Sequence, residues 1–373
     1  MSIEISRLQK PIHLEGLDRY EPGKPVAEVE RELGLRDVVK LASNENPLGP
    51  SPRAMAALRE ALADLHRYPD GPATLLRREL AQQLGVGPDQ VAIGNGSTDL
   101  IDLLARSFLG PEHNAIVSEG AFARFRQVVM ARNGRAHLVP MRAMTHDLPA
   151  MARAADQRTR LLFVANPNNP TGTWNRRAEI EALLGELPPQ VLLVLDEAYH
   201  EFAREEADYP DGTLWVRRGA PVVVLRTFSK VYGLAGLRVG YAIGAPEIIE
   251  ALDTIREPFN SNSLGQLAAR AALTDREHLR RTVELTVSER EALASALRSR
   301  GLRVLPSLGN FLLMDVERSG AEVFRRLLAL GVIVRPMGAY QFPTALRVSI
   351  GLPQENARFL SALDQVLAEI PPA

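Results

Sequence analysis

The sequence predicts an α/β fold with a doubly wound, mostly parallel sheet, followed by a smaller α+β domain. The first observation is a series of short β-branched or leucine-rich runs that end in turn residues, each followed by a segment with helical periodicity. These runs are apolar on both faces, which is typical of parallel strands covered by helices on both sides. The second is a change after about Leu264, where long amphipathic segments replace this alternation.

The expected elements follow in order along the chain. Five buried strands are predicted, at 91–93, 115–117, 161–165, 191–195 and 222–225. Helices at 264–273 and 276–300 then precede strands at 311–316, 332–335 and 346–350. The Pro- and Gly-rich stretch 46–52 suits neither a helix nor a strand interior and marks a boundary. We therefore expect an N-terminal arm that adds to the small domain (1–45), a large domain (46–262) and a C-terminal small domain (263–373).

Composition and charge narrow the classes of function. The 373 residues carry a net charge of −1 with both signs well mixed, so we expect no nucleic-acid stripe and no polybasic membrane patch. Without cysteine there are no disulfides, thiolate zinc sites or cysteine nucleophiles. The seven histidines have no spacing that puts two on one helical face, so we predict no catalytic metal. A signal core and an apolar run of roughly 20 residues are both missing, which predicts a cytoplasmic protein with a small-molecule substrate.

Lys230 stands out because lysine is rare in this chain. Only four of the 44 basic residues are lysine, and Lys230 is the sole one after Lys40. An arginine guanidinium stays protonated, whereas a lysine amine can lose its proton and form an imine with a carbonyl group. Chance retention of a surface lysine is the alternative, and the neighbouring motifs decide between the two.

Polar groups follow four of the predicted strands, and the carboxyl ends of strands in such a sheet meet at one edge. The first group is Gly94-Asn95-Gly96-Ser97-Thr98, where a strand gives way to an apolar-periodic helix. Free backbone N–H groups and the positive helix end would seat a phosphate there. An ordinary N-cap by Ser97 or Thr98 is the alternative.

The other three groups complete a pattern. Asn166-Pro167-Asn168-Asn169-Pro170-Thr171-Gly172 contains two X-Pro units that force a rigid turn. Asp196-Glu197-Ala198-Tyr199 puts an acid at the mouth of a buried strand, and Thr227-Phe228-Ser229-Lys230 places the lysine eight residues before Arg238. Taken singly, each is explained by a turn or a cap. Together they match the needs of pyridoxal phosphate: an imine-forming amine, a carboxylate for the pyridine nitrogen, donors to the phenolic oxygen and a phosphate cradle.

With these motifs the chain resembles the aspartate-aminotransferase-like pyridoxal-phosphate enzymes over about residues 20–350. The resemblance implies the type I fold of these enzymes, with a seven-stranded, mostly parallel sheet in the large domain. It implies that Lys230 carries the cofactor as an imine and shuttles the proton, that Asp196 pairs with the pyridine nitrogen, and that Tyr199 and Asn169 bond the phenolic oxygen. Further cofactor contacts are implied for Gly96, Ser97, Thr98, Thr227, Ser229 and Arg238. Tyr68 is implied to reach the cofactor phosphate of the neighbouring subunit in an obligate homodimer.

The substrate class depends on fewer residues. The stretches 20–25, 41–50, 332–335 and 346–351 are similar to the histidinol-phosphate aminotransferase branch of this family. By that similarity Tyr20, Arg335 and Arg347 grip the substrate phosphate and, in the second half-reaction, the carboxylates of glutamate or 2-oxoglutarate. Asn44 is placed among the substrate-binding residues in the same way. A solvated side chain on a strand edge is the alternative for either arginine.

Two features depart from the branch pattern. Thr98-Asp99 stands where the branch usually has an acidic pair, and the aromatic residue expected to stack on the pyridine ring is a phenylalanine. Of Phe122 and Phe125 we choose Phe125. A phenylalanine stacks but donates no hydrogen bond, so the substrate preference can differ from the branch's commonest one.

The leading hypothesis is a pyridoxal-phosphate-dependent transaminase of histidine biosynthesis, which passes the amino group of L-histidinol phosphate to 2-oxoglutarate by a ping-pong mechanism. An aromatic amino acid aminotransferase is the nearest alternative, since imidazole and phenyl pockets differ little. A pyridoxal-phosphate lyase such as a threonine-phosphate decarboxylase is another, and it would release carbon dioxide without a 2-oxo acid acceptor. A regulator with the same fold is disfavoured because such proteins add a DNA-binding segment.

Overall fold

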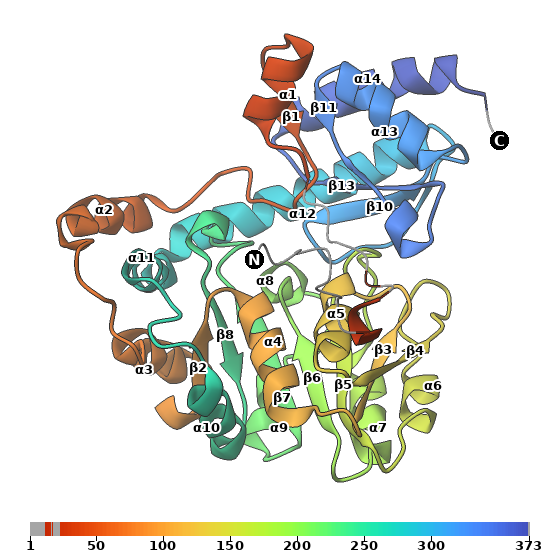
Figure 1. The fold of residues 1–373 in the computed structure, drawn as a ribbon. Helices are drawn as coiled ribbons and strands as arrows, with labels where there is room; N and C mark the ends of the chain where they lie inside the picture. Colours follow the sequence, from red (N-terminus) through yellow and green to blue (C-terminus); the bar gives the residue numbers. More distant parts are fainter. Residues whose placement is uncertain (1–11, 16, 18–22, 372–373) are drawn as a thin grey trace, which may run out of the picture.

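The computed structural model describes residues 12–15, 17 and 23–371. Figure 1 shows a large domain, which contains the main sheet, and a smaller domain above it. Tyr20 lies outside the described residues, so its predicted contact with the substrate phosphate stays a prediction.

The large domain is built on a seven-stranded sheet, which confirms the predicted α/β class. Strand β8 alone is antiparallel to its neighbours β2 and β7, and every other adjacent pair is parallel. Across the sheet the strands are β2 (Val91–Gly94), β8 (Gly240–Ile243), β7 (Val222–Thr227), β6 (Leu192–Asp196), β5 (Thr159–Ala165), β3 (Asn114–Ser118) and β4 (Arg135–Val139).

Apolar runs in the sequence predict five of these strands but not β4 and β8. Strand β4 is at the sheet edge and most of its side chains are exposed or half-buried, so no apolar run marks it. Strand β8 is buried but begins with Gly240, and glycine is depleted in strands because it has no side chain to pack.

Helices cover both faces of this sheet (Figure 1). One apolar core joins the sheet to α4 (Ser97–Phe108), α5 (Ala123–Ala131) and α10 (Pro246–Ile255). The second core takes in α3 (Thr74–Leu84), α6 (Leu148–Arg153), α7 (Arg177–Glu186) and α9 (Thr213–Arg217). Alternate residues of a strand enter different cores, as Phe163 and Val164 of β5 do, because successive side chains point to opposite faces.

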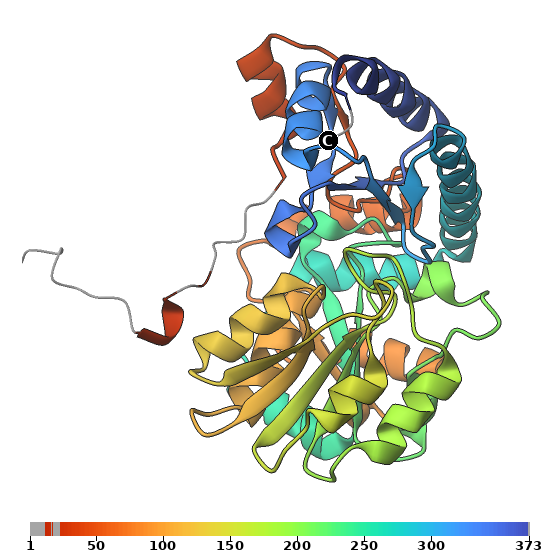
Figure 2. The same cartoon turned by 90° about the vertical axis from the view of Figure 1, so that its right-hand side faces the viewer.

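The small domain has two sheets of its own (Figure 2). The antiparallel sheet has the order β12 (Arg335–Pro336), β13 (Ala345–Ser349), β10 (Phe311–Asp315) and β9 (Arg303–Val304). In the other, β1 (Val39–Lys40) pairs in parallel with β11 (Val332–Ile333), so part of the N-terminal region belongs to this domain. The helices around the sheets are α1 (Val26–Leu33), α12 (Arg276–Arg298), α13 (Gly320–Ala329) and α14 (Pro353–Glu369).

Helix α11 (Ser263–Thr274) lies with the large domain, beside α2 (Pro52–Ala61) and α3 (Figure 1). Its residues Ala268 and Ala269 are buried in the same core as Leu76 and Leu80 of α3. The boundary predicted after residue 262 is therefore too early. The alternation of strands and helices ends before α11, but α11 still packs in the core of the large domain. The remaining short helices are η2 (Ile12–Leu14), η3 (Leu62–Asp64), η4 (Pro88–Gln90), α8 (His200–Ala203), η5 (Ala235–Leu237) and η6 (Gly338–Tyr340).

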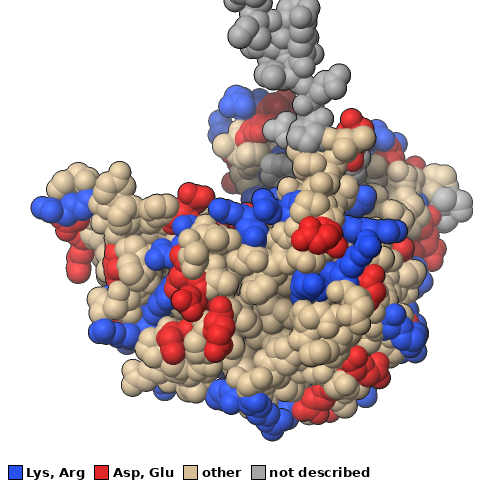
Figure 3. Space-filling view, turned by 60° about the horizontal axis from the view of Figure 1, so that its bottom comes forward, with Lys and Arg blue, Asp and Glu red and all other residues tan. Residues whose placement is uncertain are grey.

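Within the described ranges, no helix combines the length and the apolar character needed to cross a membrane. On the face shown in Figure 3, basic and acidic side chains are interspersed with large areas of other residues.

Candidate active site

A cavity of about 180 Å³ lies where the carboxyl edge of the large sheet faces the small domain. Asp196 ends β6, Thr227 ends β7, and Ser97 begins the helix that follows β2. The polar groups at these strand ends therefore meet at one place. Eleven of the predicted site residues line the cavity: Asn44, Ser97, Thr98, Asn169, Asp196, Tyr199, Thr227, Ser229, Lys230, Arg238 and Arg347.

One part of the cavity wall has the composition of an anion site. Helix α4 begins at Ser97 without a side-chain cap, so its first N–H groups are available to an anion. The hydroxyl of Ser229 lies 3.0 Å from the hydroxyl of Thr227 and 3.4 Å from Nη1 of Arg238. A helix N-terminus, two hydroxyls and a guanidinium suit a phosphate group.

Two glycines let these groups approach each other. Gly96 has a φ of 82°, and a Cβ there would lie 2.5 Å from Nη2 of Arg238. A Cβ on Gly240 would lie 2.3 Å from the backbone nitrogen of Ser97. Gly96 does not line the cavity itself. Because it has no side chain, Arg238 can approach the start of the helix. This cradle fits the phosphate of the predicted cofactor.

Lys230 brings the only amine among the cavity-lining side chains. Its Nζ donates to the carbonyl oxygen of Ser43 at 3.2 Å and lies 5.7 Å from the centroid of the Tyr199 ring. Burial lowers the pKa of Lys230 to about 8, and the nearby positive charges of Arg347 and Arg238 act in the same direction. A substantial fraction of the amine is then neutral in the physiological range, as nucleophilic attack on a carbonyl requires.

Asp196 is 6% exposed, and its Oδ1 accepts a hydrogen bond from the Ala198 N–H at 3.0 Å. Burial raises the pKa of Asp196 to about 6, while that hydrogen bond and the charge of Lys230 oppose the rise. A cationic ring nitrogen placed against the carboxyl would lower the pKa again and would itself stay protonated. The pairing of Asp196 with the ring nitrogen stays a prediction.

Two hydrogen-bond donors, the Asn169 amide and the Tyr199 hydroxyl, line the cavity together with Lys230. Oδ1 of Asn169 accepts from Nη1 of Arg347 at 2.5 Å, so its Nδ2 is available to the cavity. Nδ2 of Asn44 donates to the Tyr199 hydroxyl oxygen at 2.9 Å. Burial raises the pKa of Tyr199 to about 12, so the phenol keeps its proton at neutral pH and can donate it. Asn169 and Tyr199 thus both offer donors to an anionic oxygen.

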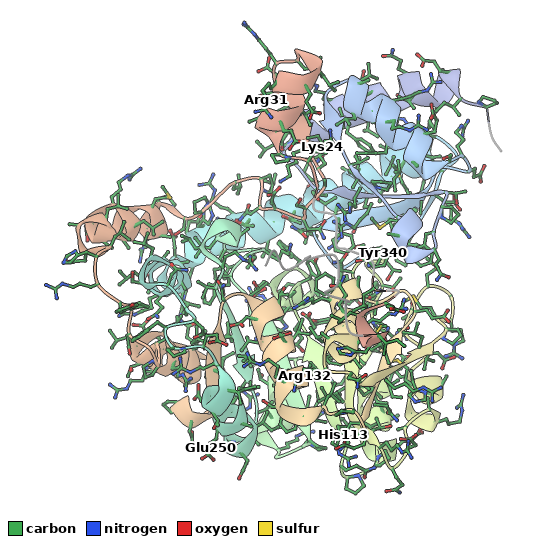
Figure 4. The ribbon with its side chains drawn as sticks, in the orientation of Figure 1. Lys24, Arg31, His113, Arg132, Glu250 and Tyr340 are labelled. Atoms are coloured by element: carbon green, nitrogen blue, oxygen red, sulfur yellow. The ribbon has the colours of Figure 1, made fainter. Side chains whose placement is uncertain are left out.

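Arg347 and Arg335 are directly opposite each other on β13 and β12. Arg347 is 8% exposed, and its Nη2 donates to the carbonyl oxygen of Ala42 at 2.7 Å. Arg335 does not line the cavity itself. Residues directly opposite on an antiparallel pair share a face of the sheet, so both arginine side chains extend from the same face. Tyr340, labelled in Figure 4, lies where the small domain faces the large one and contributes to the raised pKa of Tyr199.

Phe122, and not Phe125, belongs to the cavity wall. Phe125 is fully buried and stacks on Phe163, with 4.8 Å between the ring centroids. The prediction that Phe125 faces the cofactor ring is therefore wrong. Helix α5 begins at Ala123 and directs Phe125 into the core between this helix and the sheet, while Phe122 precedes the helix.

Tyr68 lies away from this cavity. Its side chain is 82% exposed and stacks on Phe259 with a centroid distance of 4.6 Å. It lines a second cavity of about 470 Å³ between α3 and α11. Its predicted contact with the cofactor of a neighbouring subunit stays a prediction.

Next to Asp196 in the chain, Glu197 belongs to a buried charge cluster that no sequence pattern predicts. Nη2 of Arg226 donates to Oε2 of Glu197 at 2.7 Å and to Oδ1 of Asp211 at 2.7 Å. Burial raises the pKa of Glu197 to about 7 against the opposing charge of Arg226. The ligand atoms of Glu197, His200 and Asp211 lie within 4.8 Å of one another, but Arg226 already supplies the positive charge that a metal ion would bring.

Comparison with known proteins identifies the family. A model of the family "Aminotransferase class I and II" matches residues 36–363 of the chain. The chain belongs to the class I and II aminotransferases. This aminotransferase is 47% identical over 356 residues to histidinol-phosphate aminotransferase 1 of Nitrosococcus oceani, a match that covers 95% of this chain and 96% of the relative.

Other relatives of this aminotransferase match over almost the whole length. It is 49% identical over 370 residues to histidinol-phosphate aminotransferase 2 of Pseudomonas fluorescens, covering 99% of this chain and 100% of the relative. Its fold matches the crystal structure of histidinol-phosphate aminotransferase from Sinorhizobium meliloti in complex with pyridoxal-5′-phosphate, with a TM-score of 0.88 and 30% identity. That match covers 98% of this chain and 99% of the other. The fold expected from the resemblance is thus confirmed.

Proposed function

We propose that this aminotransferase transfers the amino group of L-histidinol phosphate to 2-oxoglutarate, forming imidazole-acetol phosphate and L-glutamate in histidine biosynthesis. The observation that carries the proposal is a second arginine in the cavity wall, Arg347, in addition to Arg238 of the phosphate cradle, with Arg335 directly opposite Arg347 on the neighbouring strand. The cradle suits the cofactor phosphate, and the arginine pair suits the substrate phosphate or the carboxylates of a 2-oxo acid. Relatives at 47% and 49% identity that are named for this activity support it.

The cofactor that fits the cavity is pyridoxal 5′-phosphate, which when bound supplies an electron sink for charge that develops at the substrate carbon. Asp196 would keep the ring nitrogen protonated, and Tyr199 with Asn169 would donate to the phenolic oxygen. Phe122 would lie against the ring, in the position that the sequence predicts for Phe125. The phosphate would be held by the start of α4 and by Thr227, Ser229 and Arg238.

Lys230 is the residue that moves the proton at the substrate carbon. Because its pKa is lowered to about 8, the amine can both accept and return a proton in the physiological range. The carbonyl oxygen of Ser43 holds Nζ in place within the cavity. The lysine amine is therefore held inside the cavity, where it would be available for general acid and base steps.

A comparison of amino donors tests the substrate assignment. Enzyme loaded with the cofactor is treated with single additions of L-histidinol phosphate or L-phenylalanine, and its visible absorption band is followed. We expect histidinol phosphate to remove the band rapidly and 2-oxoglutarate to restore it. Conversion by phenylalanine alone would assign an aromatic amino acid aminotransferase, and carbon dioxide release from an added amino acid without 2-oxoglutarate would assign a lyase.

Replacing Arg347 with alanine should raise the KM for both histidinol phosphate and 2-oxoglutarate about 10- to 100-fold, since hydrogen bonds to charged groups contribute roughly 1.5–3 kcal/mol. Steady-state kinetics should show a smaller change in kcat. Arg303→Ala is the control, because Arg303 lies on the same sheet and pairs with Asp315 at the surface. An unchanged KM in Arg347→Ala would remove this arginine from the substrate site.

We also propose that two copies of the chain pair through the surface around Tyr68. Six large hydrophobic side chains are exposed on or next to the second cavity: Leu62, Leu65, Tyr68, Leu75, Phe259 and Leu267. Contiguous exposed apolar residues of this kind are typical of protein interfaces.

Sedimentation should give twice the 41.0 kDa of one chain. Leu267→Glu should shift the protein toward monomer, whereas Leu138→Glu on the edge strand β4 should not; a monomeric wild type would refute the pairing.

A further inference from the structure

The segment 41–44 passes the cavity, and the small domain holds it there. The Ser349 N–H donates to the Leu41 carbonyl oxygen at 2.8 Å, and Nδ2 of Asn310 donates to the Asn44 carbonyl oxygen at 3.0 Å. Asn44 is 1% exposed and has a φ of 54°, in the left-handed region. A buried residue in this conformation is kept there by its surroundings, so its side chain has a defined direction.

The Ser349 hydroxyl determines which way the Asn44 amide faces. Its Oγ accepts from the Asn44 N–H at 2.8 Å and donates to Oδ1 of Asn44 at 3.0 Å. Because Oδ1 faces Ser349, Nδ2 faces the Tyr199 hydroxyl oxygen, 2.9 Å away. An amide NH₂ can only donate, so the Tyr199 oxygen accepts and its own proton is free for another acceptor.

We infer that Ser349 is a positioning residue, which orients the Asn44 amide so that Tyr199 donates its proton into the cavity, toward the phenolic oxygen of the cofactor. This inference deepens the proposed function and rests on it. Ser349 does not line the cavity and lies 305 positions from Asn44 in the chain. It links the small-domain sheet to a cofactor contact on the large domain.

The direction of this chain of hydrogen bonds has an electrostatic consequence. A hydrogen bond received by a hydroxyl polarises its O–H and makes it a stronger donor. A stronger donor stabilises the anionic phenolic oxygen, so that the bound cofactor loses its titrating proton at lower pH. Without the Ser349 hydroxyl, the Asn44 amide can turn over so that its Oδ1 faces Tyr199. Tyr199 would then no longer donate its proton into the cavity, and the cofactor should keep its titrating proton up to a higher pH.

The test is a pH titration of the visible absorption band of the holoenzyme without any amino donor. Ser349→Val and Ser349→Thr have the same shape and differ in the hydroxyl. We expect Ser349→Val to raise the pH midpoint by about 0.5–1 unit and Ser349→Thr to stay close to the wild type, since one net hydrogen bond corresponds to about that shift. Ser349→Ala removes the hydroxyl without added bulk and should give the same shift as Ser349→Val.

A matched control separates positioning from loss of stability. The Thr159 hydroxyl has the same pattern, accepting from the Asp156 N–H at 2.9 Å and donating to Oδ1 of Asn114 at 2.7 Å. Thr159 is the first residue of β5, at the end of this strand that lies opposite the cavity. Thr159→Val should lower the melting temperature and leave the midpoint unchanged.

Either of two results would overturn the inference: Ser349→Val and Ser349→Ala that titrate like the wild type, or Ser349→Val and Ser349→Thr that shift the midpoint equally. No donor substrate enters this titration. A wild-type enzyme that failed to use histidinol phosphate would contradict the proposed substrate and would leave this comparison intact.

Discussion

Replacing Lys230 with alanine or arginine should abolish transamination, by at least about 1,000-fold, because both the covalent and the proton-transfer roles require a neutral amine. The arginine variant is the more informative one, since it keeps the positive charge at the cavity. The cradle proposed for the cofactor phosphate consists of the start of α4, Thr227, Ser229 and Arg238, so both variants should still retain part of the cofactor after gel filtration.

Lys24→Arg is the matched control for this experiment. Lys24 is an exposed lysine that pairs with Glu28 and Glu32 on α1, far from the chemistry in sequence. It should keep full activity. Full activity in Lys230→Arg would contradict the amine mechanism, whereas loss of activity together with complete loss of cofactor would contradict the separate phosphate cradle.

Replacing Arg226 with leucine should destabilise the large domain by about 3–5 kcal/mol, because it leaves the carboxyl of Glu197 buried without its partner. Arg226 is 4% exposed and the Glu197 side chain is fully buried. Urea unfolding followed by tryptophan fluorescence is suited to the measurement, since Trp174 and Trp215 both belong to the large domain. Arg280→Leu is the control, because Arg280 pairs with Glu277 and Glu284 on the exposed face of α12, and it should change the stability little.

The loss of stability caused by Arg226→Leu should depend on pH. Burial already raises the pKa of Glu197 above its ordinary value of 4.5, and removal of the arginine charge raises it further. At a pH between the pKa of Glu197 in the unfolded state and its higher pKa in the folded state, the folded protein binds a proton that the unfolded chain lacks. The free energy of unfolding therefore falls as the pH rises through this range. The difference from the wild type should therefore be larger at pH 8.5 than at pH 6. A difference that does not vary with pH would show that Glu197 is not the group left unpaired.

Local patterns predicted most of the fold and most of the cavity. Buried strands such as β6 and β7 are continuous apolar runs, and the residues that follow them meet because parallel strands share a carboxyl edge. The resemblance then supplied the roles of residues such as Asn169 and Arg347, which no local pattern gives.

The features that were missed depend on contacts between distant parts of the chain. Phe122 and Phe125 are three residues apart, and only the start of α5 decides which of them faces the cavity. Helix α11 looks like the small-domain helices, but its alanines pack in the large-domain core. Arg226 lies within a buried strand, where its partners Glu197 and Asp211 come from other segments. Charge pairs of this kind have no signature in a single stretch of sequence.

The antiparallel direction of β8 allows one loop to bring both Lys230 and Arg238 to the cavity. The chain leaves β7 at Thr227 and enters β8 at Gly240, and these residues are paired partners. The Phe228 N–H bonds to the carbonyl oxygen of Val239, so the loop closes on itself at the carboxyl edge. A parallel strand would need a crossover to the opposite edge of the sheet. The reversal instead keeps the amine of Lys230 and the guanidinium of Arg238 on one short, closed connection, so a shift of that loop would move both groups together.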